Sequence, residues 1–246
     1  NNYLQYYYYA WSSEIIYFLN QQRSLLALQK AEKMKKQAFA DRYPYGIFSC
    51  IRTMGHIYKS RGNFDLSAQY YQEALDYMLK NMPDQDPSQL YSSLAEYYRN
   101  TQKDYATALD YCEKALKSAK TERNIAQAMI EKCLVLFRQG RIDEFNDCYK
   151  EAVQMADRCK LSANVSLLIA HISKNILDKQ YEQAHAHADQ LSEKGLQQHA
   201  YIYECAKDYP NAIKYLKKYH QQLDSTNNLL QLSDIAELNT QIAPNA

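Results

Sequence analysis

Apolar residues recur along almost the whole chain at spacings of three and four, which is the period of one face of an α-helix. No segment alternates apolar and polar residues over the length of a strand. In the N-terminal segment one apolar row runs through Leu4, Tyr8, Trp11, Ile15 and Phe18. Tyr9 and Ile16 make a second row beside it, so we expect this helix to pack between two neighbours.

The helical pattern itself repeats along the chain, most clearly at residues 50–75, 91–116, 129–153 and 199–219. Each unit reads as two helices joined by a short turn, with one position of the second helix usually occupied by a small residue. That position falls at residues 27, 67, 108, 145, 184 and 212. Phe145 is the large exception, and predicts a locally wider hairpin. Spacings of about 40 residues indicate a repeat array rather than separate domains.

The best-defined unit is CIRTMGHIYKSRGNFDLSAQYYQEAL, residues 50–75. Its first helix carries Ile51, Met54, Gly55 and Tyr58, its turn Gly62, and its second helix Ser67, Tyr71 and Ala74. This resembles the tetratricopeptide repeat (TPR), W-x2-L-G-x2-Y followed by A-x3-F over about 34 residues. The resemblance implies an all-α fold, a right-handed α-α superhelix (TPR solenoid) of about six helical hairpins plus a C-terminal helix. We expect the solenoid at residues 1–224 and a capping or connecting helix with its tail at 225–246.

Glycine positions agree with this register. Gly55 falls where two helices cross closely, and Gly62 and Gly140 fall at turns inside hairpins. Gly195 has the pattern of a helix C-terminal cap.

Tyrosine makes up 24 of the 246 residues, and five of them lie in YLQYYYYAW at residues 3–11. Those in repeat positions are expected to pack between helices rather than to bind a ligand. They are Tyr58, Tyr71, Tyr91, Tyr98, Tyr149 and Tyr203, and Tyr8 and Trp11 receive the same interpretation. Tyr3, Tyr6 and Tyr7 stay open between a capping role and an aromatic edge that meets a partner or a second copy.

Charge and composition narrow the partners. The 29 basic and 28 acidic residues are spread along the chain and give a net charge of +1, which argues against nucleic acid or an anionic membrane. No apolar run reaches the roughly 18 to 20 residues of a membrane span, so no membrane insertion by this segment is expected. The six cysteines show no metal-ligand spacing and are expected to pack as small apolar residues, which favours a reducing compartment. The chain begins at Asn1 rather than Met, which indicates a processed form or part of something longer.

Catalytic motifs are absent from the sequence: there is no G-x-S-x-G, P-loop, H-E-x-x-H or dinucleotide fingerprint. We therefore predict a protein that is not an enzyme and that needs no cofactor or metal. The nearest approach to a metal motif is HAHAD, His185 to Asp189. His185 and His187 point about 200° apart on a helix, and although His185 and Asp189 share a face, a solvated helical face is the better interpretation.

The TPR resemblance implies that ligands lie in a concave groove lined by the first helix of each hairpin. Projected onto this sequence, the groove carries Ser49, Arg52, His56, Lys59, Gln89, Ser92, Glu96, Arg99, Gln127 and Ile130, with Leu134 further along. Arg52, His56 and Lys59 form a basic stripe suited to a carboxylate or an acidic peptide. The alternative is an ordinary solvated face. Chaperone-binding TPR domains carry a lysine and an asparagine at the first two of these places, where this chain has Arg52 and His56.

The C-terminal stretch YLKKYHQQLDSTNNLLQLSDIAELNTQI, residues 215–242, gives a second resemblance. It is similar to the junction after the TPR input region of bacterial membrane-bound signalling proteins that carry a histidine kinase or a helix-turn-helix module. The matching residues are Leu216, Lys217, Tyr219, Leu223, Asp224, Ser225, Ile235, Ala236, Glu237 and Leu238. The alternative is a plain capping helix.

Two functions follow from these resemblances. The first is a non-catalytic TPR scaffold that binds protein or peptide, as the sensor or interaction region of a larger bacterial signalling protein at the cell envelope. The second is a free-standing cytoplasmic TPR adaptor that docks a peptide or protein partner. In either case a homodimer through the terminal helices is a further possibility.

Overall fold

The computed structural model describes residues 2–161, 164–191 and 195–242, and the last four residues of the predicted C-terminal segment lie outside these ranges. All regular structure within them is helical, which confirms the all-α prediction. The elements are α1 (Asn2–Asn20), α2 (Ser24–Ala40), α3 (Pro44–Ser60), α4 (Phe64–Asn81), α5 (Ser88–Tyr97), η1 (Tyr98–Gln102), α6 (Tyr105–Ser118), α7 (Glu122–Gln139), α8 (Ile142–Arg158), α9 (Val165–Leu177), α10 (Tyr181–Ala188), α11 (Gly195–Cys205) and α12 (Tyr209–Ile242).

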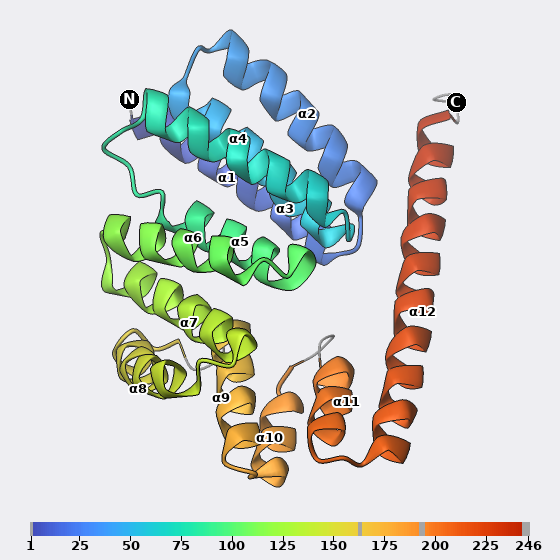
Figure 1. The fold of residues 1–246 in the computed structure, drawn as a ribbon. Coiled ribbons are helices and arrows are strands. Elements are labelled where there is room, and N and C mark those ends of the chain that lie inside the picture. The colour runs from blue at the N-terminus through green and yellow to red at the C-terminus, as the bar shows by residue number, and fades with distance from the viewer. Residues whose placement is uncertain (1, 162–163, 192–194, 243–246) are drawn as a thin grey trace. The chain divides into compact units, whose positions relative to one another are not determined.

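Within the described residues, helices pack as hairpins in α1 with α2, α3 with α4, α7 with α8 and α9 with α10. The segment η1, which follows α5, packs against α6, and Tyr203 of α11 contacts Tyr215 of α12, in agreement with the repeat pattern. Figure 1 shows the antiparallel course of α3 and α4 and of α9 and α10. The chain divides into two compact units, Asn1–Leu94 with Thr226–Ala246, called here unit 1, and Ala95–Ser225, called unit 2. The helix α12 is continuous from Tyr209 to Ile242, so the domain boundary expected near residue 224 stays a prediction.

The six predicted small-residue positions of the second helices all lie in the interior. Ala27, Ser67, Ala108, Phe145, Ala184 and Ala212 are each at most 5% exposed. Five of them let the two helices of a hairpin approach closely, because a small side chain leaves room at the crossing. Phe145 fills its position instead: its ring lies 5.6 Å from Phe137 and 5.7 Å from Tyr149.

Glycine has a steric role in the α3–α4 hairpin. A Cβ atom on Gly55 would lie 2.6 Å from the ring of Tyr71, so only glycine admits that ring at this crossing. Gly62 and Gly140 adopt φ values of +74° and +73°, which confirms their prediction as turn residues. Gly195 does not cap a helix end as predicted; it begins α11, where a Cβ would meet the carbonyl oxygen of Ala188 at 2.9 Å.

Tyr8 holds α1 to the rest of unit 1. Its side chain is fully buried, its ring lies against the backbone of Gly46, and its hydroxyl donates to a carboxylate oxygen of Asp41 at 2.5 Å. Tyr9 does not pack against a second neighbour as its apolar row predicted, because it is 60% exposed. One side of α1 therefore faces α2 and α3, and the other side is a tyrosine-rich surface.

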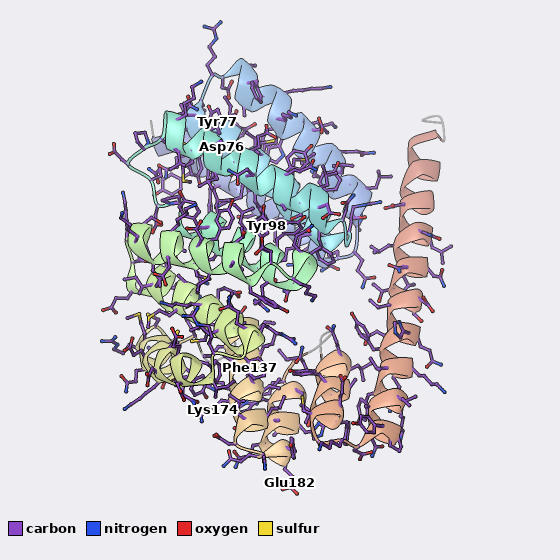
Figure 2. The ribbon with its side chains drawn as sticks, in the orientation of Figure 1. Asp76, Tyr77, Tyr98, Phe137, Lys174 and Glu182 are labelled. Atoms are coloured by element: carbon purple, nitrogen blue, oxygen red, sulfur yellow. The ribbon has the colours of Figure 1, made fainter. Side chains whose placement is uncertain are left out.

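Tyrosines in repeat positions pack between helices, as predicted. In unit 2, Tyr98, which is labelled in Figure 2, stacks on Tyr111 with ring centroids 5.5 Å apart. In unit 1, Tyr58 stacks on Tyr70 at 5.3 Å. The six cysteines are free thiols, and three of them, Cys50, Cys112 and Cys133, are buried as the packing interpretation predicted.

Candidate functional site

The predicted groove residues of α3 divide between the interior and the surface. Ser49 is fully buried, and its hydroxyl lies 2.7 Å from that of Ser12 on α1. Thr53 completes the cluster by donating to the carbonyl oxygen of Ser49 at 2.7 Å. The prediction of Ser49 as a ligand-binding residue is therefore wrong for this structure: α1 covers it, and its hydroxyl joins two helices.

Arg52, His56 and Lys59 share one face of α3, where His56 is exposed and the two cations are half-buried. The guanidinium of Arg52 lies over the ring of Phe48, 5.3 Å from its centroid. His56 is exposed, but its Nδ1 lies 2.9 Å from the hydroxyl of Tyr71, which fixes the ring. Desolvation, followed by the positive charges of Arg52 and Lys59, lowers the pKa of His56 to about 4. At neutral pH this face thus presents two cations on either side of an uncharged imidazole.

Arg99, another predicted groove residue, is 5% exposed and belongs to the interior of unit 2. Its Nη2 donates to Glu131 on α7 at 2.8 Å, and the other oxygen of Glu131 accepts from Ser166 on α9 at 2.7 Å. Burial disfavours the charged guanidinium, but the Glu131 carboxylate outweighs it and raises the pKa of Arg99. Arg99 therefore ties successive first helices together and offers no surface to a ligand, which corrects its assignment.

The other predicted groove positions are spread over both units. Gln89 is exposed and Ser92 half-buried on α5, where Glu96 is also half-buried. Gln127 is half-buried on α7, whereas Ile130 is 1% exposed and part of the core, so its assignment is wrong as well. Among these ten positions, those of α3 place two half-buried cations, Arg52 and Lys59, on either side of the exposed His56.

The HAHAD segment is not the solvated face that its sequence predicted. His185 lies with its Nδ1 2.7 Å from the Nδ1 of His199 on α11, and His199 contacts the Asp189 carboxylate at 3.0 Å. His187 stacks on His171 of α9 with centroids 5.0 Å apart. Within the described ranges, no three His, Cys, Asp or Glu side chains are placed to hold one metal ion.

Two members of these pairs, His171 and His185, favour the uncharged state. Burial, followed by the neighbouring ring of His187, lowers the pKa of His171. Burial and then His199 lower the pKa of His185 in the same way. The short contact between the Nδ1 atoms of His185 and His199 needs one donor and one acceptor, so the pair cannot carry two protons on these atoms. The two pairs thus join α9 to α10 and α10 to α11.

A groove that sequence reasoning did not identify lies between α1 and α2. It has a volume of about 610 Å³ and is lined by Tyr7, Trp11 and Glu14 from α1 and by Leu26, Lys30 and Lys33 from α2. Trp11 is therefore only partly used in packing. The signal in the sequence was the four-residue spacing of Tyr3, Tyr7 and Trp11, which places the three rings in one row.

None of the described helices combines the length and the apolarity that crossing a bilayer requires.

One sequence family and several solved structures are similar to this chain. Residues 52–86 match the sequence model of the tetratricopeptide repeat. PilW, a widely conserved type IV pilus biogenesis factor, has a similar fold, with a TM-score of 0.57, 13% identity, and coverage of 91% of this chain and 98% of PilW. PilF of Pseudomonas aeruginosa gives a TM-score of 0.53 at 11% identity, over 92% of this chain and 96% of its own. BtubC (BKLC) from P. vanneervenii gives 0.52 at 16% identity, over 85% and 92%. No curated protein sequence matches the chain.

The matched residues contain α4, most of α3 and the Gly55–Tyr71 crossing, which are the features that the repeat pattern requires. Because the sequence identities are 11–16%, the solved structures support a similarity of fold alone. That similarity agrees with the helical hairpins of both units. Residues 52–86 thus match one tetratricopeptide repeat, and the fold of the chain is similar to that of these solved structures.

Proposed function

We propose that the chain is a non-catalytic scaffold that binds a peptide or protein segment through the outer face of α3. The observation that carries this proposal is the row of Arg52, His56 and Lys59 on a helix whose inner side is fixed in the core. Arg52 is supported by Phe48 and His56 by Tyr71, so the face loses little side-chain freedom when it binds. Two cations beside a neutral imidazole suit a segment that presents carboxylates.

The test is retention of a partner on immobilised protein from cell-envelope and cytosolic fractions. A variant with Arg52→Glu and Lys59→Glu should lose at least about tenfold of the retained partner, the loss of roughly 1.4 kcal/mol or more. A matched control, Lys80→Glu with Lys117→Glu, makes the same charge change at exposed positions on α4 and α6 and should retain the partner as the wild type does. Equal retention by all three proteins would show that the α3 face is an ordinary solvated surface.

The setting of the scaffold has two candidates. The 34-residue helix α12 favours an interaction region that continues into an output module of a signalling protein. The free thiols favour an adaptor in a reducing compartment. Sequencing the gene beyond Ala246 separates them, because an apolar span followed by a kinase or helix-turn-helix module supports the first and a stop codon the second. Light scattering of the purified chain tests the third possibility, a homodimer through the terminal helices.

A further inference from the structure

The tyrosine-rich side of α1 forms a continuous aromatic row. Tyr3 stacks on Tyr7 with centroids 6.3 Å apart, and Tyr7 meets the edge of Trp11 at 5.5 Å. Tyr3 is 74% exposed and Tyr7 39%. Large apolar side chains that lie singly on a surface need no explanation, but a contiguous aromatic row beside a groove is typical of a contact surface.

One side of this row contacts the buried Tyr8, with ring centroids 5.2 Å from Tyr7 and 6.4 Å from Trp11. The side of α1 that faces the core presents Tyr8, Ser12 and Ile15, which are buried and contact the neighbouring helices. Tyr7 and Trp11 lie on the adjoining flank of the helix, and their groove opens to solvent. The aromatic row is therefore available for a function other than the fold of the hairpin.

The packing of unit 1 indicates which kind of element can bind in the groove between α1 and α2. On the core side of the first hairpin, α3 packs against both α1 and α2. The groove of Tyr7, Trp11 and Leu26 lies between the same two helices, on a flank that α3 does not cover. A groove between two antiparallel helices takes a third helix, whose side chains fit between the rows of the other two.

The charges on the groove wall indicate the charge that a bound helix should carry. Lys30 and Lys33 line it, and α2 carries Lys35 and Lys36 as well, against Glu32 as its one acidic residue. Glu14, the acidic residue of the α1 wall, is bound to the amino group of Lys30 at 2.7 Å, so these two charges offset each other and Lys33 supplies the excess positive charge of the lining. The rim of the groove is thus positive and its floor aromatic.

We propose that the α1–α2 groove docks an amphipathic helix of a partner protein, with an apolar row seated on Tyr7 and Trp11 and acidic residues facing the lysines of α2. This surface is separate from the α3 face of the proposed function, and variants of the two faces distinguish them. A second copy of the chain is the alternative occupant, which the test below also detects.

The partner helix can be found by selection on the 246-residue chain. The probe is a display library of helices of about 20 residues, with an apolar row at i, i+3, i+4 and i+7 and randomised flanks. Helices retained by the wild type and lost by Tyr7→Ala should show an excess of Asp and Glu on their flanks. Retained flanks without that excess, or retention that Tyr7→Ala leaves unchanged, would overturn the proposal.

Trp11 then measures the binding directly, because it is the only tryptophan in the chain and lines the groove. Titration with a selected helix should shift its fluorescence in a saturable way, and Lys33→Glu should weaken binding at least about tenfold. Two controls should bind as the wild type does: Tyr17→Ala, an exposed tyrosine of α1 outside the groove, and the Arg52→Glu, Lys59→Glu variant. Loss of binding in the latter variant alone would place the helix on α3. Concentration-dependent dimerisation that Tyr7→Ala abolishes, with no effect of the helix, would identify a second copy as the occupant.

Discussion

Two seams, one in each unit, join successive first helices through different polar chemistry. In unit 1 the seam between α1 and α3 is neutral and is built from the hydroxyls of Ser12, Ser49 and Thr53. In unit 2 the seam from η1 through α7 to α9 is charged and is built from Arg99, Glu131 and Ser166. Losing one hydrogen bond between buried hydroxyls costs little free energy, whereas removing one partner of a buried ion pair leaves an uncompensated charge in the interior. A substitution in the charged seam of unit 2 should therefore destabilise the fold more than one in the neutral seam of unit 1.

The largest difference should appear when Arg99 is replaced by Met. Glu131 would keep its bond from Ser166 but lose its counter-charge in the interior, and the free energy of unfolding should fall by about 3–5 kcal/mol. The double variant Arg99→Met, Glu131→Leu should recover most of that loss, since it removes both charges. Urea denaturation of the two variants measures this, and a loss below about 1 kcal/mol in the single variant would mean that the pair behaves as an exposed one.

An intermediate effect is expected from acidification, which should loosen both units through their own histidines. Because the folded-state pKa values of His56, His171 and His185 lie below the usual 6.5, the unfolded chain binds more protons as the pH falls. Their stabilising contribution is complete above about pH 6.5 and is lost as the pH falls below it.

Amide hydrogen exchange at about pH 5 and pH 7.5 measures this loosening helix by helix. His56→Gln should remove the pH dependence near α3 and α4 only, and the double variant His171→Gln, His185→Gln that of α9 to α11 only. Unchanged pH dependence in both variants would show that other groups govern the acid response.

The smallest effect is expected from Ser49→Ala in the neutral seam. The bond from Thr53 goes to the backbone carbonyl of residue 49 and survives, so only the contact with the Ser12 hydroxyl is lost. The midpoint of urea denaturation should therefore report a loss of about 1 kcal/mol. A loss as large as that of Arg99→Met would remove the distinction between the two seams.

Much of the fold follows from local spacing, and little of the site does. The small positions such as Ala108, and the turn residues Gly62 and Gly140, are set by neighbours within the same hairpin, and the sequence displays that period. The partner of His185 is His199, fourteen residues away on another helix, and no local pattern indicates that the two rings meet. The sequence also gives no indication that Lys103 and Lys179 are left-handed turn residues. Their φ values are +57° and +58°, and lysine seldom adopts that region of backbone conformation.

Groove residues were the weakest part of the sequence reasoning for a related reason. A repeat register gives the direction of a side chain relative to its own helix, but not whether a neighbouring helix covers it. Ser49 is covered by α1 and Ile130 belongs to a core cluster around α7 and α8, whereas His56 remains at the surface. The tyrosines of α1 present the opposite case: Tyr3, Tyr6 and Tyr7 were left open by the sequence, and they lie on the surface.

The π-helical segment η1 shows how a repeat can change the use of one position. The small residue of the second helix lies nine positions after Tyr58 in one unit, at Ser67, and ten positions after Tyr98 in the next, at Ala108; η1 lies within this longer connection. Arg99 and Lys59 directly follow the matching tyrosines of their repeats, Tyr98 and Tyr58, yet Lys59 is half-buried on the surface and Arg99 is interior. The same position relative to the repeat tyrosine thus carries a half-buried surface cation in one unit and a buried cation paired with Glu131 in the other. A sequence alignment of these repeats that puts its gaps only in the loops would therefore pair a surface residue of one repeat with a buried residue of another.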